Sequence, residues 1–231
     1  TVRELSVAPY LGGTATGTTL DLADVKLLAP AEPSKVFAVG YNYDSHRGDR
    51  VLPAHPPIFL KLPTTIIGPN AEIIYPEGAT DVHYEAELVV VIGKTASKVS
   101  VEDAGDYIFG VTAGNDVSER TWQAGDRTLW RAKNTDTFKP MGPWIETEAN
   151  PEDMQTTVRL NGEVVSQFAT NNMIFGIAHY IAEMTKYVAL YPGDMIWMGT
   201  DGATQNMKAG DTVEVEITGI GTLRNPLIGE E

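Results

Sequence analysis

The chain has 231 residues and a formal net charge of −14, with 17 Lys and Arg residues against 31 Asp and Glu residues. This acidic balance argues against nucleic acid and anionic membrane surfaces as partners, and an anionic substrate would need cations at its own site. The length allows one domain, or one domain with a small appendage. The absence of cysteine excludes disulfides, thiolate nucleophiles and Cys-ligated zinc.

The first residues give expectations about location. No apolar run approaches the length of a membrane span, and the start, Thr1-Val-Arg-Glu-Leu5, has no signal-peptide character. We therefore expect a cytoplasmic protein. Residues 1–34 are rich in Gly, Thr, Ala and Pro with weak periodicity, which predicts short strands and loops ahead of the main body.

The rest of the chain predicts many strands and few helices. A buried strand is followed by a polar loop over residues 41–50, and later strands are separated by turns with Gly, Pro, Asn or Asp. Strands are predicted at Lys35–Gly40, Ile58–Lys61, Glu72–Tyr75, Leu88–Ile92, Tyr107–Ala113, Met195–Met198 and Thr212–Ile217. We therefore expect a β-rich mixed fold, and not an alternating parallel α/β fold.

Three local signals complete this outline. Asn161-Gly162 suits a type I′ turn and predicts a hairpin over Thr157–Ser166. Apolar residues at helical spacing predict a helix over Asn172–Lys186. Ser100-Val-Glu-Asp103 has the form of a capping box and predicts the start of a short helix.

Two glutamates stand at the start of the predicted strand His83-Tyr-Glu-Ala-Glu-Leu-Val-Val-Val-Ile-Gly93. Because side chains on a strand alternate, Glu85, Glu87, Val89 and Val91 share one face. Two carboxylates that continue an apolar face are costly unless they have a partner, and a divalent cation is one such partner. A strand whose polar end emerges into solvent would give the same pattern.

Asp116 follows the next predicted strand, in Gly114-Asn-Asp-Val-Ser-Glu-Arg120. Combined with Glu85 and Glu87 it would give three carboxylates, a ligand set that suits Mg²⁺, Mn²⁺ or Ca²⁺ and disfavours zinc. Three protein ligands would leave positions open for water or a chelating substrate. From local sequence alone, a helix cap or turn is the commoner role for such an aspartate.

Cations and an amide come soon after Asp116. Arg120 and Gln123 would share a helix face, and an arginine beside a metal site can hold a substrate carboxylate in a bidentate fork. Lys133 could supply a second cation, and a metal with two cations is the arrangement that stabilises the enolate of a 2-oxo acid. A surface arginine paired with an acid, and a surface lysine, are the alternative interpretations.

His46 and Asp49 lie three residues apart in the polar loop after the first buried strand. On a helical turn the carboxylate would face the imidazole and make it a general base that activates water, on a loop suited to act as a lid. A solvated polar loop explains the same spacing. The segment Trp197-Met-Gly-Thr-Asp-Gly-Ala203 ends a strand in a glycine-flanked loop whose amides could approach an anion.

The chain resembles the fumarylacetoacetate hydrolase family, because these stretches follow one another in the order found in that family. The resemblance covers roughly residues 35–228. The matching segments are Gly40-Tyr-Asn-Tyr-Asp-Ser-His46, Tyr84-Glu-Ala-Glu-Leu-Val-Val-Val-Ile-Gly93, Asn115-Asp-Val-Ser-Glu-Arg-Thr-Trp-Gln123, Lys133-Asn-Thr-Asp-Thr-Phe138 with Gly142-Pro143, Asn161-Gly-Glu163, Met173-Ile-Phe175, Pro192-Gly-Asp194, Gly199-Thr200 and Gly219-Ile-Gly-Thr-Leu223.

The resemblance implies an α+β, β-rich fold with a mixed β-sheet roll of the family's C-terminal type and a few short helices. It implies a small N-terminal region with a lid over residues 1–55, a catalytic domain over residues 56–231, and a homodimer. It implies Mg²⁺ or Mn²⁺, with Ca²⁺ as an alternative. The metal ligands implied are Glu85, Glu87 and Asp116; the residues implied around a 2-oxo acid are Arg120, Gln123, Lys133 and Thr200.

The family's reactions pass through a metal-bound enolate and suggest three hypotheses. In the first, His46 oriented by Asp49 activates water, Lys133 stabilises the enolate, and a C–C bond of an acylpyruvate-type 2,4-dioxo acid is hydrolysed. In the second, the site isomerises 2-hydroxy-dienedioates, of the kind met in aromatic catabolism, or decarboxylates oxaloacetate-like diacids. In the third, the chain is a catalytically silent binder of 2-oxo acids.

Two departures from the family pattern bear on the hydrolytic step. Asp49 stands where hydrolytic members usually carry glutamate, which is one methylene longer. The family's Gly-Thr-Pro-x-Gly loop reads Gly199-Thr-Asp-Gly-Ala203, so a proline is lost and Asp201 adds negative charge near the proposed anion site. Neither departure touches the predicted metal ligands.

Overall fold

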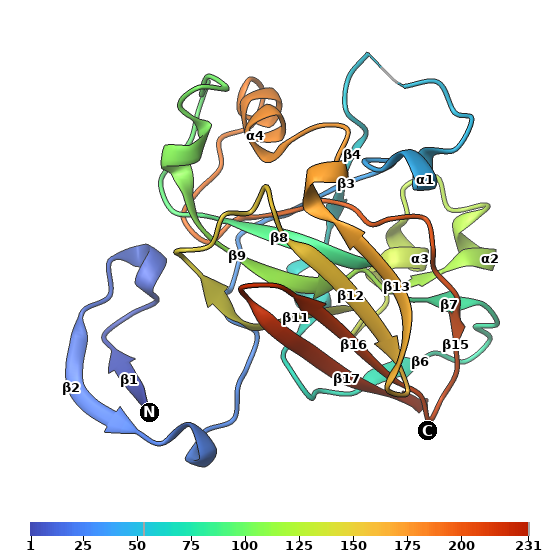
Figure 1. Ribbon diagram of the computed structural model, residues 1–231, viewed down its shortest axis with the longest axis horizontal. Coiled ribbons are helices and arrows are strands. Elements are labelled where there is room, and N and C mark those ends of the chain that lie inside the picture. Colours follow the sequence, from blue (N-terminus) through green and yellow to red (C-terminus); the bar gives the residue numbers. More distant parts are fainter. Residues whose placement is uncertain (53, 231) are drawn as a thin grey trace.

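The computed structural model describes residues 1–52 and 54–230. Position 53 of the region predicted over residues 1–55, and position 231 of the region predicted over residues 56–231, lie outside the described residues. Two large mixed sheets curl around a common core, with short helices at their margins (Figure 1). This confirms the β-rich α+β fold expected from the scarcity of helical periodicity and the frequent turn signals.

The larger sheet carries the site. Its seven strands are mostly antiparallel, but β14 pairs parallel with β3 and β11 pairs parallel with β5, so the sheet is mixed. In spatial order the strands are β4 (Ile58–Lys61), β3 (Val36–Val39), β14 (Met195–Trp197), β8 (Ala86–Ile92), β9 (Ile108–Asn115), β11 (Lys139–Glu146) and β5 (Ile66–Ile67).

The second sheet has five strands and contains the predicted hairpin. Asn161 and Gly162 both have positive φ, +54° and +84°, as a type I′ turn requires. The spatial order is β13 (Glu163–Ala169), β12 (Gln155–Leu160), β16 (Thr212–Ile217), β17 (Gly221–Gly229) and β6 (Ile73–Tyr75). Two small sheets are formed by β10 (Ser118–Glu119), β7 (Val82–His83) and β15 (Asn206–Met207), and by β1 (Val2–Leu5) and β2 (Ala15–Leu20).

Strand β8 separates two apolar clusters, as its alternation predicts. Leu88, Val90 and Ile92 belong to the main core, which also fills the space against the five-stranded sheet. Val89 and Val91 belong to a second cluster with Trp197 and the N-terminal segment. Every residue of β8 is buried, so Glu87 within it and Glu85 just before it belong to a strand that has no solvent-exposed face.

The helices are short. They are α1 (Asp44–Arg47), α2 (Arg120–Gln123), α3 (Trp130–Asn134) and α4 (Ile177–Thr185). The helix predicted over Asn172–Lys186 is wrong at its start, because residues 170–172 form a 3₁₀ turn and Met173 is extended, so α4 begins after Gly176. Ser100 accepts a hydrogen bond from the Asp103 amide (3.1 Å), but only a 3₁₀ turn follows, at Ala104–Tyr107.

The N-terminal segment lies to one side of the molecule (Figure 1) and packs against interior strands of the larger sheet. Tyr10 meets Phe109 edge to face at 5.9 Å and lies against Gly193. Strand β3 falls inside the region predicted as residues 1–55, yet it occupies an interior place between β4 and β14. The N-terminal region therefore contributes a strand to the sheet that carries the site.

Candidate active site

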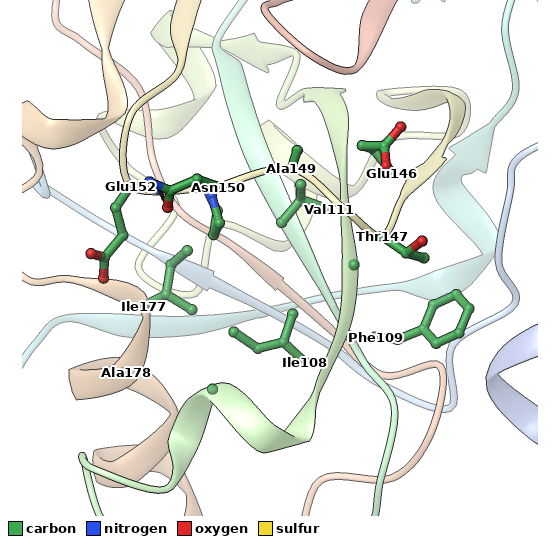
Figure 2. A pocket seen from close by; sticks show the side chains of 13 residues that line it. Ile108, Phe109, Val111, Glu146, Thr147, Ala149, Asn150, Glu152, Ile177 and Ala178 are labelled. Atoms are coloured by element: carbon green, nitrogen blue, oxygen red, sulfur yellow. Dashed lines mark hydrogen bonds between the residues drawn. The ribbon is translucent and has the colours of Figure 1, made fainter.

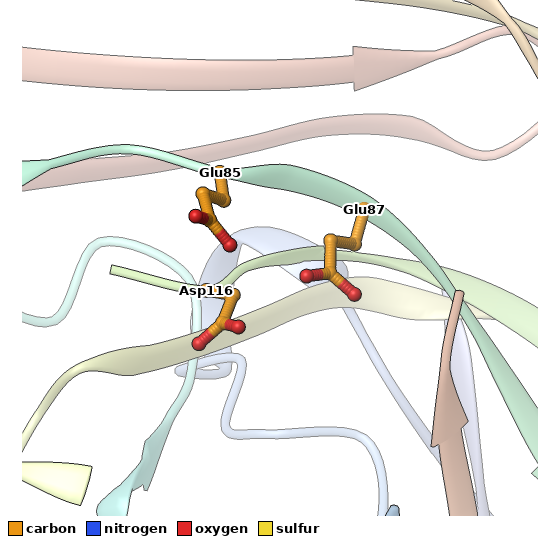
Figure 3. A group of neighbouring side chains, drawn as sticks. All are labelled: Glu85, Glu87 and Asp116. Atoms are coloured by element: carbon orange, nitrogen blue, oxygen red, sulfur yellow. The ribbon is translucent and has the colours of Figure 1, made fainter. Parts of the chain in front are cut away.

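Three carboxylates meet where β8 begins and β9 ends. Ala86 pairs with Asn115 across the antiparallel ladder, so Glu85 and Glu87 lie beside Asp116, which directly follows β9. One oxygen from each residue lies within 4.8 Å of the other two (Figure 3). The residues are buried, with exposures of 3, 1 and 0%. The alternative of a strand end in solvent is thereby excluded.

Four cationic side chains surround this triad. Lys133 Nζ lies 2.6 Å from Glu85 Oε2 and 2.9 Å from Asp116 Oδ2, and it donates to Ser118 Oγ at 2.7 Å. Arg120 lies 2.6 Å from Glu85 Oε1. The other two cations are Lys61, 2.6 Å from Asp116 Oδ2, and Lys139, 2.7 Å from Asp116 Oδ1.

Burial and these ion pairs shift the pKa values of the three acids in different directions. Burial raises the pKa of Glu87 to about 8. Burial alone would also raise the pKa of Glu85, but the cations of Lys133 and Arg120 lower it. Burial likewise opposes ionisation of Asp116, yet its three lysine neighbours hold the pKa well below the ordinary value. The triad therefore contains one acid that keeps a proton near neutral pH.

Two of the three lysines also differ in the direction of their pKa shifts. Burial alone would lower the pKa of Lys133, but Asp116 and Glu85 raise it above its ordinary value, so this amine stays protonated. Burial lowers the pKa of Lys139 to about 7. Lys133 can thus act as a fixed positive charge, and not as a base.

The donor set fits a hard divalent cation. All candidate ligand atoms are carboxylate oxygens, and Glu85 Oε1 and Asp116 Oδ1 accept no hydrogen bond of good geometry although cations lie close by. A ligand set of oxygens alone suits Mg²⁺, Mn²⁺ or Ca²⁺. The identity of the ion stays a prediction.

A cavity of about 520 Å³ opens beside the triad. Residues predicted to be catalytic and residues predicted to bind substrate both line it. They are His46 from α1, Arg120 and Gln123 from α2, Lys133 from α3, and Thr200 from the loop after β14. Arg120 donates to Gln123 Oε1 at 2.8 Å, which fixes the two side chains relative to each other. The structure thus brings together every predicted substrate-binding residue, while their roles remain predictions.

The predicted dyad is not formed as a contact. Helix α1 ends at Arg47, and within the described residues no hydrogen bond joins His46 to Asp49, which is not among those lining the cavity. His46 Nδ1 instead lies 3.3 Å from the carbonyl oxygen of Thr200. A carbonyl only accepts, so this contact places the proton on Nδ1 and leaves Nε2 basic. Burial lowers the pKa of His46, so the ring is neutral at pH 7.

The loop after β14 joins the triad to α1. The Gly199 amide donates to Glu87 Oε2 at 2.8 Å. Ser45 Oγ donates to Asp201 Oδ2 at 2.7 Å and accepts from the Gly202 amide at 3.3 Å. A Cβ at Gly202 would lie 2.8 Å from the Ser45 carbonyl oxygen. The sequence departure at Asp201 therefore has a structural role: it fastens this loop to the helix that carries His46.

Several site residues escape prediction from sequence. Lys61 and Lys139 sit in apolar strands, where a lone lysine gives no signal of its partner. Tyr41 and Arg50 line the cavity from the polar loop. The structure, and not the sequence, distinguishes Tyr41, because its φ of +54° is uncommon for a residue other than glycine.

A second cavity, of about 320 Å³, lies between the start of β9, residues 146–152 and α4 (Figure 2). Ile108, Val111 and Ile177 give it an apolar lining. Among the described residues around it, the charged ones are Glu146 and Glu152. Without a cation it does not suit an anionic substrate, so the triad cavity is the candidate active site.

Comparisons with known proteins find family matches over most of the chain. The family model described as "Fumarylacetoacetate (FAA) hydrolase C-terminal" matches residues 35–228, and one described as "Rv2993c-like, N-terminal" matches residues 1–30. The chain is 44% identical to Protein Rv2993c of Mycobacterium tuberculosis over 234 residues, which cover 99% of this chain and 88% of that protein.

Two further relatives are named for an activity. A crystal structure of 5-carboxymethyl-2-hydroxymuconate delta-isomerase from Mycobacterium smegmatis superposes with a TM-score of 0.93 at 41% identity, covering 99% of this chain and 90% of that one. The chain is 36% identical to the mitochondrial oxaloacetate tautomerase Fahd2a of Rattus norvegicus, covering 89% of this chain and 70% of that protein.

The fold and the site define a β-rich enzyme class with a buried acidic triad beside a cation-lined cavity. The chain belongs to the fumarylacetoacetate hydrolase family, as its resemblance predicts. No helix in the described part of the chain is both long and apolar enough to cross a bilayer.

Proposed function

We propose that the chain is a divalent-metal-dependent tautomerase or isomerase of 2-oxo acids, which moves a proton at an enolate. The observation that carries this proposal is His46, a neutral histidine on the cavity wall whose Nδ1 contact with Thr200 leaves Nε2 as a base. One proton leaves the C2 enol oxygen and one is added at C3, so the reaction needs no co-reactant. The two relatives named for an isomerase and a tautomerase support the same class.

The other residues would hold the substrate and its charge. Glu85, Glu87 and Asp116 would hold the ion, which when bound supplies Lewis-acid polarisation of a substrate oxygen. Arg120 would fix the 2-oxo acid carboxylate, with Gln123 and Thr200 as polar partners. Lys133, which stays protonated, would stabilise the negative charge that develops on the enolate.

The proposal is tested by following the enol-to-keto conversion of oxaloacetate with Mg²⁺ or Mn²⁺ and then with chelator. We expect metal-dependent loss of the enol without release of pyruvate. His46→Gln should lower kcat by about a hundredfold or more, because proton transfer by a positioned side chain contributes about that much. His55→Gln is the matched control, because His55 contacts Glu183 outside the cavity (3.3 Å).

Hydrolysis of an acylpyruvate is the second candidate, and the same His46 favours it because a neutral imidazole can activate water. It requires an orienting group for the ring, and within the described residues the contact with Thr200 takes the place of one with Asp49. Rapid metal-dependent release of pyruvate from acetylpyruvate would favour this candidate over the tautomerase. Binding of oxalate without turnover of any of these compounds would indicate a silent binding protein.

A cytoplasmic homodimer is part of the proposal. Leu28, Leu60 and Leu62 are 69, 60 and 52% exposed, and a second copy could cover such apolar surface. Light scattering of the purified protein should give twice the mass of the chain; a mass of 25.0 kDa would contradict the dimer.

A further inference from the structure

Arg50 is a cation of the active-site cavity that none of the roles above uses. It lies in the loop after α1 and lines the cavity together with Arg120 and Lys133. Both of those cations already contact Glu85 (2.6 Å each), and Lys133 also contacts Asp116. Arg50 makes no ion pair with any carboxylate of residues 1–52 and 54–230. Its charge is therefore available to a ligand.

Local structure holds the Arg50 side chain at the cavity. Its guanidinium carbon lies 4.8 Å from the centre of the Tyr41 ring, and its Nη1 donates to the Arg47 carbonyl oxygen at 3.3 Å. The Arg47 guanidinium in turn donates to the Arg50 carbonyl oxygen at 2.5 Å. A guanidinium has five N–H donors, so most remain free after these contacts. Stacking on an aromatic face orients the planar fork at little further entropic cost.

Tyr41 connects Arg50 with the reacting centre. Its ring lies 5.7 Å from the ring of His46, centre to centre, and it adopts a left-handed backbone with φ +54°. Such a backbone is unfavourable in a residue other than glycine and is kept where the surroundings require it. The strained Tyr41 thus places its ring in contact with both the histidine and the arginine.

Charge balance indicates what Arg50 would bind. The triad contributes three carboxylates, and Lys61, Lys133, Lys139 and Arg120 contribute four basic groups. A divalent ion would make the centre positive enough for the head group of a 2-oxo acid without Arg50. Arg50 adds a separate bidentate donor at another part of the wall, which suits a second carboxylate on the same substrate.

We propose that Arg50, held by Tyr41, binds the distal carboxylate of the substrate and so selects 2-oxo dicarboxylic acids over 2-oxo monocarboxylic acids. This inference rests on the proposed function, because it assumes that the 2-oxo acid head group occupies the end of the cavity at Arg120 and Lys133.

The test measures binding to the metal-loaded protein by calorimetry with two matched pairs of ligands. The pairs are 2-oxobutanoate with oxaloacetate and 2-oxopentanoate with 2-oxoglutarate, which differ by a terminal carboxylate. In the pair whose diacid binds more tightly, we expect the diacid to bind at least about tenfold more tightly than the matching monoacid. A charge-assisted contact contributes about that much. Arg50→Gln should abolish the difference and leave the monoacid Kd within about twofold.

Two further variants sharpen the result. Arg127→Gln removes the same charge from an exposed arginine outside the cavity lining and should leave the preference unchanged. Arg50→Lys should restore part of it, because lysine keeps the charge but not the fork. Equal binding of monoacids and diacids by the native protein, or equal weakening of both by Arg50→Gln, would overturn the role of Arg50 alone. Failure of every 2-oxo acid to bind would overturn the proposed function and this inference together.

Discussion

At the scale of single residues, the centre is a set of buried charges whose balance depends on protonation. Three carboxylates in apolar surroundings are tolerated because cations contact them, and removal of one partner from such a cluster leaves an uncompensated buried charge. Glu87 responds differently from its neighbours, because burial raises its pKa to about 8. This acid would therefore make metal binding at the triad depend on pH.

Metal affinity should rise with pH up to about 8 and level off above it. Below that pH a bound ion must displace the proton of Glu87, so each pH unit strengthens binding by up to about tenfold. Lys139, with a pKa of about 7, loses its charge over the same range and acts in the same direction. Calorimetry in two buffers of different ionisation enthalpy should show proton release at pH 7. Affinity that is independent of pH between about 6 and 9 would contradict this expectation.

Lys139→Met should strengthen metal binding. The lysine is fully buried and contacts Asp116 Oδ1, so it competes with an ion for the same oxygen. The Lys139 ammonium has the same sign of charge as a metal ion and lies beside the proposed metal site, so its removal should raise metal affinity by about tenfold. Lys61 and Lys133 still neutralise Asp116. Lys186→Met, at an exposed lysine paired with Glu183, is the control. Weaker binding in Lys139→Met would show that the amine organises the site.

At the scale of elements, helix α1 and the loop after β14 form one unit. Ser45 and Asp201 are hydrogen-bonded, and the backbone of Gly202 lies against the backbone of Ser45 and His46. Movement of α1 must therefore move Thr200, whose carbonyl contacts the His46 ring. His46, the proposed base, and Thr200, a proposed substrate contact, are therefore positioned together.

Gly202→Ala should lower kcat with little change in stability. The new Cβ would lie 2.8 Å from the Ser45 carbonyl oxygen and 3.0 Å from the His46 Cα, so the helix must shift, and small misplacements at an active site cost up to about a hundredfold in rate. Hydrogen exchange should increase over residues 44–50. Gly105→Ala meets nothing within 4 Å and is the control. An unchanged kcat in Gly202→Ala would show that α1 tolerates displacement.

Sequence periodicity predicts the elements well where it is strong, and side-chain partners poorly. Alternation along residues 84–92 correctly divides β8 between two cores, and Asn161-Gly162 correctly locates a turn. The start of α4 is missed because the apolar spacing continues through an extended residue. Lys61 and Lys139 are missed because their partner, Asp116, lies just after another strand, and contacts across a sheet leave no trace in local sequence.

At the scale of the molecule, residues 1–55 are not simply an appendage to the site-bearing sheet. Strand β3 is an interior strand between β4 and β14, and the buried Asp194 receives hydrogen bonds from Ser34 (2.6 Å) and from the Lys35 amide (3.1 Å). Residues up to Leu20 form a separate two-stranded sheet. A chain that folds by itself should therefore have to begin before Ser34.

A chain that begins at residue 31 should remain folded, and one that begins at residue 56 should not. The shorter deletion removes Tyr10 and its contact with Phe109, which should lower the melting temperature by several degrees, whereas the longer one removes an interior strand. Circular dichroism and thermal unfolding distinguish the two. Cooperative unfolding of the fragment 56–231 would show that the predicted boundary at residue 55 separates autonomous units.

The pairing of β8 with β9 has a consequence for folding fidelity. Glu87 lies opposite Gly114, and a Cβ at that glycine would come within 2.7 Å of both Trp197 and Val89. A slip of one residue would bring a bulkier side chain under the indole and turn both glutamates away from Asp116. The close packing at Gly114 therefore disfavours a shifted pairing of β8 with β9, and the same shift would break up the acidic triad.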